Sequence, residues 1–213
     1  MVDDRKEVAE LSRELSLELV RVTEAAAIES GRWVGKGNKI AADQAAVDAM
    51  RGAFDELQIS GTIVIGEGEM DEAPMLYIGE KVGAGGQEVD IAIDPLEGTT
   101  LTAKGLSGAI AVLAMANKGG LLHAPDMYLM KMAVGPKAAG KIKLDAPIKD
   151  NVQGVAESWN RRIEELTVVV LDRPRHDTLI SDIRKAGARV HLITDGDVSP
   201  ALSVGIEGTG IHM

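Results

Sequence analysis

Apolar residues near the amino terminus of the chain recur at helical spacing. Five of them follow one another at intervals of three or four residues: Val8, Leu11, Leu15, Leu19 and Val22. Because residues at this spacing fall on one face of an α-helix, the pattern predicts a long amphipathic helix over about residues 5–30. A glycine-rich loop follows at residues 35–39, and a second helix is predicted over about residues 41–57.

Short apolar runs rich in β-branched residues predict the strands. The runs lie at residues 62–65, 89–93, 108–115, 166–171 and 189–194, and a short alternating stretch at 141–144 predicts one more strand. Residues 176–186, between the last two runs, have a helical pattern. This part of the chain therefore predicts a β-α-β unit with parallel strands and a right-handed crossover.

The order of these elements predicts an α/β protein. Residues 146–165 are polar, irregular to helical, and separate the two groups of elements. We therefore expect one domain over residues 1–148 and a second, partial lobe over residues 149–213. With 213 residues, 45% of them hydrophobic, the chain has ample material for a packed core.

Composition and charge narrow the function classes. Aromatic residues make up only 2% of the chain, and the formal net charge is -10 at pH 7. A nucleic-acid partner is not expected, because binding a polyanion needs clustered cations and, for single strands, aromatic stacking. The chain has no cysteine, which excludes disulfides, thiolate metal sites and a cysteine nucleophile.

The amino-terminal residues argue against a membrane role. Residues 1–7 are mostly charged and lead into the first amphipathic pattern without an apolar signal core. No apolar run in the sequence is long enough to span a bilayer. We therefore expect a cytoplasmic location and no membrane partner.

An acidic turn follows the apolar run at residues 89–93. Asp94 comes at the end of that run, Pro95 is expected to end strand pairing because it has no N–H to donate, and Glu97 returns a second carboxylate to the same place. Two such carboxylates repel each other unless they bind a hard cation such as Mg²⁺ or Mn²⁺. The N–H groups and hydroxyls of residues 98–100 suit a phosphate oxygen, so the turn points to metal-assisted phosphoester hydrolysis. Ordinary turn chemistry is the alternative.

A second acidic turn, at residues 66–72, follows the apolar run at 62–65 and carries Glu67. Two strands that both end in acids suggest one shared cation cluster. Asp43 lies near the predicted start of the second helix. An acid at that position either joins the cluster or simply complements the positive end of the helix dipole.

Charged residues also follow both strands of the predicted β-α-β unit. Residues 173–177 open its helix and form either a phosphate clamp or a solvated helix start. Asp195 and Asp197 follow the next strand, where open α/β sheets bind ligands, and acids there suit sugar hydroxyls. Tyr128 either donates its hydroxyl to a phosphate or packs with that hydroxyl in solvent. Besides bound metals, four residues offer local cations: Lys39, Lys131, Arg175 and His176.

The acidic turns carry a family resemblance. Residues 94–99, with the sequence D-P-L-E-G-T, are preceded by G-E-G-E at 66–69, and this combination resembles the metal-dependent, lithium-sensitive sugar and inositol phosphatases. Further stretches narrow the resemblance to class II fructose-1,6-bisphosphatase, the bacterial type: residues 42–47, 71–77, 172–176 and 195–197. The resemblance runs through nearly all of the chain. It implies an αβαβα layered sandwich and a homo-oligomer, either a dimer or a tetramer.

The resemblance also implies an activity and roles for residues. The activity would be hydrolysis of the 1-phosphate of fructose 1,6-bisphosphate in gluconeogenesis, with sedoheptulose 1,7-bisphosphate as a second substrate in a photosynthetic host. Asp43 with Glu67 would bind one Mn²⁺ or Mg²⁺ ion, and Asp94 with Glu97 a second. Substrate contacts would come from eleven residues: Glu97, Gly98, Thr99, Tyr128, Arg173, Pro174, Arg175, His176, Asp195, Gly196 and Asp197. The attacking water would be oriented or deprotonated by Thr99, Lys39 and Asp71.

The sequence departs from the family at its carboxyl end. It stops at residue 213, whereas the family continues into a glycine-rich segment with a further acidic metal ligand. We therefore expect the N-terminal portion of the enzyme, with an incomplete second metal site. Two alternatives stay open: an inositol monophosphatase-like enzyme, and an inactive fragment that still folds. The charged loops at 173–177 and 195–197 favour a sugar with two phosphates over inositol.

Overall fold

The computed structural model describes residues 4–68, 75–124 and 127–213, with side chains from residue 15 onward. The chain divides into two compact units, a first unit of residues 1–127 and a second unit of residues 128–213. Each unit combines helices with a sheet, so the predicted α/β class is confirmed. The αβαβα layer order stays a prediction.

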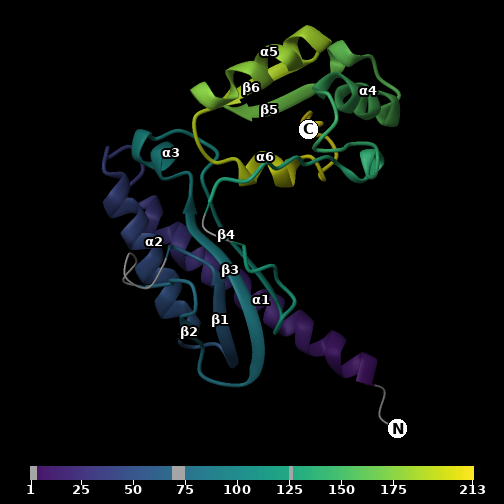
Figure 1. Ribbon diagram of the computed structural model, residues 1–213. Helices are drawn as coiled ribbons and strands as arrows, with labels where there is room; N and C mark the ends of the chain where they lie inside the picture. The colour runs from purple at the N-terminus through teal and green to yellow at the C-terminus, as the bar shows by residue number, and fades with distance from the viewer. Residues whose placement is uncertain (1–3, 69–74, 125–126) are drawn as a thin grey trace. The chain divides into compact units, whose positions relative to one another are not determined.

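The first unit is a four-stranded sheet with two long helices on one face (Figure 1). Its elements are α1 (Asp4–Gly31), α2 (Lys39–Phe54), β1 (Ile59–Ile65), β2 (Lys81–Val82), β3 (Gln87–Glu97), α3 (Thr99–Lys104) and β4 (Ile110–Asn117). The strand order is β2-β1-β3-β4; β1 and β3 run parallel, and the two outer strands are antiparallel to their neighbours.

The core of the first unit follows from the two periodicities of the sequence. Alternate residues of β1 and β3, such as Ile63 and Ile91, point toward the helices and are fully buried. They meet one face of α2, where Met50 and Phe54 are also fully buried. The α2 helix begins at Lys39 because the side chain of Asn38 accepts the Ala41 N–H at 3.0 Å as an N-cap.

The second unit contains a parallel pair of strands with a helical crossover (Figure 1). Its elements are η1 (Pro136–Ala138), α4 (Ile148–Trp159), η2 (Ile163–Glu165), β5 (Thr167–Leu171), η3 (Pro174–His176), α5 (Asp177–Ala186), β6 (Arg189–Ile193) and α6 (Val198–Ser203). The predicted β-α-β unit is therefore confirmed. Its core lies between α4, α5 and β5, with Val155, Val168 and Ile183 buried.

The strand predicted at residues 141–144 is wrong. The backbone of Lys143 is bonded to a side chain instead of a neighbouring strand: Asn151 Oδ1 accepts the Lys143 N–H at 2.8 Å, and Asn151 Nδ2 donates to the Lys143 carbonyl at 2.9 Å. Since the polar groups of this backbone are satisfied by α4, no strand pairing is needed. Ile142 packs on the second core, which accounts for the alternating pattern.

The division between the units also comes earlier than the predicted boundary at 148/149. Residues that precede α4 belong to the second unit, because Ala138 is buried in its core and Val134, Ile142 and Ile148 pack against that core. The polar stretch at 146–165 contains α4 and η2 of the second unit. Polarity there reflects the outer face of a helix, not a linker.

No helix in the described parts of the chain is long and apolar enough to cross a membrane.

Candidate active site

The end of β3 carries two of the predicted metal ligands on one face of the sheet. Asp94 lies opposite Val112 of β4, and Glu97 lies opposite Ile110, so β3 holds one residue more than β4 between these pairs. In a regular strand, residues three apart point to opposite faces, and one extra residue corrects this. The bulge therefore brings the two carboxylates together.

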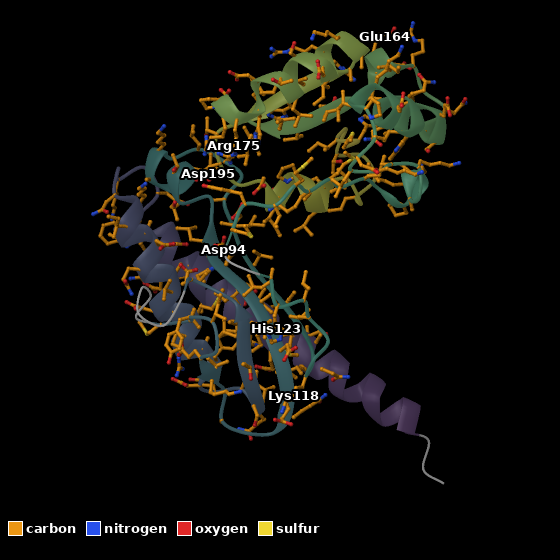
Figure 2. The ribbon with its side chains drawn as sticks, viewed as in Figure 1. Asp94, Lys118, His123, Glu164, Arg175 and Asp195 are labelled. Carbon is orange, nitrogen blue, oxygen red and sulfur yellow. The ribbon has the colours of Figure 1, made fainter. Side chains whose placement is uncertain are left out.

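Pro95 does not end the strand, contrary to the sequence prediction. It lies inside the bulge, where its lack of an N–H leaves no ladder bond unmade, and pairing resumes at Glu97. The carboxylate of Asp94 accepts the Leu96 N–H at 3.1 Å, which fixes its direction within the bulge. Figure 2 shows Asp94 near this end of β3.

The carboxyl groups of Asp94 and Glu97 hydrogen-bond to each other. Burial first, and then the hydrogen bond and charge of Glu97, raise the pKa of Asp94 from 3.8 to about 8. Glu67 also contributes to this rise through its charge. Without a cation, Asp94 therefore holds a proton at neutral pH.

Glu67 and Asp43 extend the same electrostatic environment. Glu67 follows β1, and burial together with the charge of Asp43 raises its pKa from 4.5 to about 7. Asp43 lies in the second turn of α2, and burial raises its pKa as well. Each of these acids is thus linked by charge or hydrogen bonding to the next one. We call the four residues the acidic cluster: Asp43, Glu67, Asp94 and Glu97.

The atoms of the acidic cluster that could coordinate a metal are all carboxylate oxygens. Mg²⁺ and Mn²⁺ prefer such oxygen ligands. Burial, and after it the neighbouring acids, raise the pKa values of Glu67 and Asp94, so the protein surroundings stabilise the charged forms of these carboxylates poorly. A divalent cation would stabilise those charged forms, so the residues fit such an ion. Among the described residues, no three acids or histidines are already gathered in a geometry that could hold a metal.

Two of the three predicted water-activating residues, Lys39 and Thr99, lie on elements that are tied together. Backbone N–H groups of the loop before α2 donate to α3: Gly35 to the Thr102 carbonyl and Gly37 to the Ala103 carbonyl, both at 2.9 Å. Lys39 begins α2 and is exposed, while Thr99 begins α3. Asp71 lies outside the described residues.

Gly98 connects the acidic cluster to α3 in a conformation that favours glycine. Its φ of 97° and ψ of 45° lie in the left-handed region, and a Cβ there would meet Leu101 and Ala109 at 3.1–3.3 Å. This conformation turns the chain directly from Glu97 into Thr99. The three predicted substrate contacts at 97–99 are therefore held in one tight turn.

The two charged loops of the second unit meet at the carboxyl ends of β5 and β6. Arg173 joins them, because its Nη2 donates to the Thr194 carbonyl at 2.7 Å and its Nη1 to the Asp172 carbonyl at 3.1 Å. Pro174 begins η3, and His176 at its end places Nδ1 2.8 Å from the Leu171 carbonyl. The two loops therefore lie side by side at one end of the parallel pair.

Tyr128 is brought to the same loops by a cation–π contact. The guanidinium carbon of Arg175 lies 4.6 Å from the centre of the Tyr128 ring, and both side chains are exposed. Lys131 Nζ lies 3.8 Å from Asp197 Oδ2. Figure 2 marks Arg175 and Asp195 at this end of the second unit, and Gly196 between the two acids has a φ of 79°.

Two residues near the acidic cluster were not predicted. Glu80 is a buried carboxylate that binds Arg51 and the Leu76 N–H in the turn beside Glu67. Arg51 and Glu80 are 29 positions apart and belong to no motif, so only their contact in the folded chain reveals them.

Comparison with known proteins agrees with this geometry. Residues 13–213 match the family model described as bacterial fructose-1,6-bisphosphatase, glpX-encoded. The chain is 54% identical to the D-fructose 1,6-bisphosphatase class 2/sedoheptulose 1,7-bisphosphatase of Synechococcus sp. (strain JA-3-3Ab) over 215 aligned residues, which cover 95% of this chain and 62% of the relative. It is 53% identical to the fructose-1,6-bisphosphatase 1 class 2 of Escherichia coli (strain K12) over 193 residues, or 90% of this chain and 57% of the relative.

This chain thus spans about three-fifths of the length of these relatives. The family model, by contrast, matches almost the whole chain and includes both the acidic cluster and the charged loops of the second unit. The resemblance seen in the sequence motifs is confirmed: the chain belongs to the bacterial, glpX-encoded fructose-1,6-bisphosphatase family.

Proposed function

We propose that this chain supplies the metal-binding and substrate-binding groups for hydrolysis of the 1-phosphate of fructose 1,6-bisphosphate. The observation that carries the proposal is the acidic cluster, in which the pKa of Asp94 is raised to about 8 and that of Glu67 to about 7. The names of the relatives support the substrate class, and those from Synechococcus add sedoheptulose 1,7-bisphosphate as a second substrate.

The acidic cluster would hold two Mn²⁺ or Mg²⁺ ions, one at Asp43 and Glu67 and the other at Asp94 and Glu97. When bound, such ions supply charge neutralisation on the phosphoryl oxygens and lower the pKa of a water molecule. The contribution of the chain is to hold four deprotonated carboxylates together. The proton on Asp94 would be lost on binding.

Residues beside the cluster would handle the attacking water. Thr99 follows the turn from Glu97 and can accept or donate a hydrogen bond through its hydroxyl. Because a threonine hydroxyl is a weak base, we assign it the orientation of the water and assign Lys39 and Asp71 its polarisation and deprotonation.

The charged loops of the second unit would bind a phosphate and hydroxyls of the sugar phosphate. Arg175 is exposed, and its guanidinium lies over the ring of Tyr128. A guanidinium suits phosphate oxygens because it can donate two parallel hydrogen bonds. Asp195 and Asp197 lie on the adjoining loop and suit sugar hydroxyls.

The test is phosphate release by the purified 213-residue chain from fructose 1,6-bisphosphate with Mn²⁺ or Mg²⁺. Inositol 1-phosphate serves as the substrate control and a chelator as the metal control. Metal-dependent turnover of the bisphosphate alone supports the proposal. Turnover of inositol 1-phosphate instead, or no turnover by a folded chain, contradicts it. Gluconeogenesis as the pathway, the cytoplasmic location and the homo-oligomer stay predictions.

A further inference from the structure

Glu80 is a buried carboxylate with two structural partners. Its side chain is only 10% exposed, and its Oε1 accepts a hydrogen bond from Arg51 Nε at 2.5 Å. Its Oε2 accepts the backbone N–H of Leu76. Because both oxygens are used, Glu80 joins helix α2 to the turn that contains Leu76.

Leu76 in turn holds the backbone of Glu67. The carbonyl of Leu76 accepts the Glu67 N–H at 3.0 Å, and the neighbouring Ile78 N–H donates to the Gly68 carbonyl at 2.9 Å. Leu76 is completely buried although its φ is 57°, a region that leucine rarely adopts. An unfavourable conformation of this kind persists only where surrounding contacts enforce it, and the Glu80 carboxylate provides such a contact.

The turn that contains Gly66 packs tightly against the turn that contains Leu76. A Cβ at Gly66 would lie 2.1 Å from the Leu76 carbonyl oxygen, so the backbone before Glu67 is pressed directly against Leu76. A shift of Leu76 would therefore move Glu67. The link runs without a break from Arg51 through Glu80 and Leu76 to Glu67.

The same helix carries Asp43. Asp43 and Arg51 both lie on α2, about two turns apart. One acid of the cluster is thus fixed by α2 directly, whereas Glu67 is fixed by α2 through Arg51 and Glu80. We propose that Arg51 and Glu80 are positioning residues that set the separation of Glu67 from Asp43, the pair assigned above to one divalent ion. The inference deepens the proposed function and rests on it.

The variants Arg51→Met and Glu80→Gln break the link, and Asp55→Asn is the matched control. Asp55 is the second ion-pair partner of Arg51, but its side chain is 63% exposed, and the carboxylate that accepts the Leu76 N–H beside Glu67 is that of Glu80. The control therefore removes one ion pair of Arg51 and leaves the link intact. Arg51→Lys, which keeps the charge, is the milder variant if Arg51→Met fails to fold.

Two measurements test the inference on the 213-residue chain. Amide hydrogen exchange of Glu67 and Ile78, without metal, is expected to become at least tenfold faster in Arg51→Met and Glu80→Gln but not in Asp55→Asn. The dissociation constant for Mn²⁺, from titration of the free-ion spin-resonance signal, is expected to rise about tenfold in the same two variants, as for other residues that orient metal ligands.

The outcomes separate the inference from the proposed function. Unchanged exchange at Glu67 in folded Arg51→Met or Glu80→Gln overturns the positioning role. Faster exchange with unchanged Mn²⁺ affinity also overturns it, because the link would then be structural only. If the unsubstituted chain binds no Mn²⁺, the proposed function fails, and faster exchange would still support the link to Glu67.

Discussion

Burial favours the neutral form of titratable groups in both units of the molecule, but with different consequences. In the first unit, Asp94 and Glu67 are acids whose pKa values are raised to about 8 and about 7, and each lies beside another acid. In the second unit, His212 is a base whose pKa is lowered, mainly by burial. Its Nδ1 accepts the Thr167 N–H at 3.1 Å, and its ring packs edge-on against Trp159.

The difference lies in what the surroundings provide. The neutral form of His212 is what its partners need, since its acceptor nitrogen completes the backbone bonds beside β5. The neighbours of the acids of the first unit are mainly other acids. A bound cation would stabilise the charged forms of these acids. A shifted pKa therefore indicates a ligand site only where the protein leaves the group with like-charged neighbours.

The largest effect is expected from replacing Asp94, which tests whether the buried acids of the first unit bind a cation. We expect Asp94→Asn to lower Mn²⁺-dependent turnover on the order of 100-fold, because it removes a proposed metal ligand. Above about pH 8, where Asp94 is charged, the melting temperature of the metal-free chain should rise, since the substitution removes the repulsion with Glu97. Asp48→Asn, an exposed acid on α2, is the control. Unchanged turnover in Asp94→Asn would exclude Asp94 from the site.

The next largest effect concerns the pH dependence of the metal-free first unit. Because the pKa values of Glu67 and Asp94 are higher in the folded state than their ordinary values of 4.5 and 3.8, the folded state binds more protons than the unfolded state. Its free energy of unfolding should therefore fall as the pH rises from about 4 to about 8. Each kcal/mol lost lowers the melting temperature by roughly 2–4 °C.

Each unit contains one tryptophan, so this slope can be measured separately. Trp33 packs on the first core and Trp159 on the second. In a Trp159→Phe chain, the fluorescence transition of Trp33 reports the first unit. Its midpoint should decrease between pH 5 and pH 8 with a chelator present and recover when Mn²⁺ is added at pH 8. A midpoint that rises with pH would contradict the raised pKa values.

The sequence predicted the acids of the site but not how they meet. Asp94 and Glu97 stood out because they follow an apolar run, yet the bulge that turns both to one face depends on the register with β4. Pro95 was expected to end the strand from its own chemistry, and only the pairing of Glu97 with Ile110 shows that it does not. The pairing register depends on both strands, so it cannot be predicted from the sequence of either strand alone.

Helices and strands with strong periodicity were predicted well, and elements held by side chains were not. The long helix α1 and the parallel pair β5 and β6 follow from local patterns. The stretch at 141–144 alternates like a strand, but Asn151, from a helix further along the chain, takes its hydrogen bonds. The short helices α3 and α6, with six residues each, have too few turns to show a period.

A smaller effect is expected from replacing Arg175, an exposed arginine of the second unit. Arg175→Met should raise the KM for fructose 1,6-bisphosphate about tenfold, the equivalent of one charged hydrogen bond of about 1.4 kcal/mol, with kcat within about twofold. Arg184→Met, an exposed arginine on α5, is the control. A fall in kcat at unchanged KM would place Arg175 at the chemistry instead of at the far phosphate.

The smallest effect is expected in the pH dependence of the stability of the second unit, which contains His212. Because its pKa is lower in the folded state than the ordinary value of 6.5, the folded state binds fewer protons, and the second unit should lose stability as the pH falls below about 6.5. The loss should be about 1 kcal/mol or less, the net value of one hydrogen bond to a backbone N–H.

In a Trp33→Phe chain, the unfolding midpoint of Trp159 should therefore decrease on acidification from pH 7 to pH 5, opposite in sign to that of Trp33. His212→Asn keeps an acceptor that cannot be protonated in this range and should flatten the slope. Midpoints of both tryptophans that move in the same direction would refute the contrast. Opposite slopes, one removed by Mn²⁺ and the other by His212→Asn, would distinguish buried acids that lack a cation from a buried histidine that already has its hydrogen-bond partner.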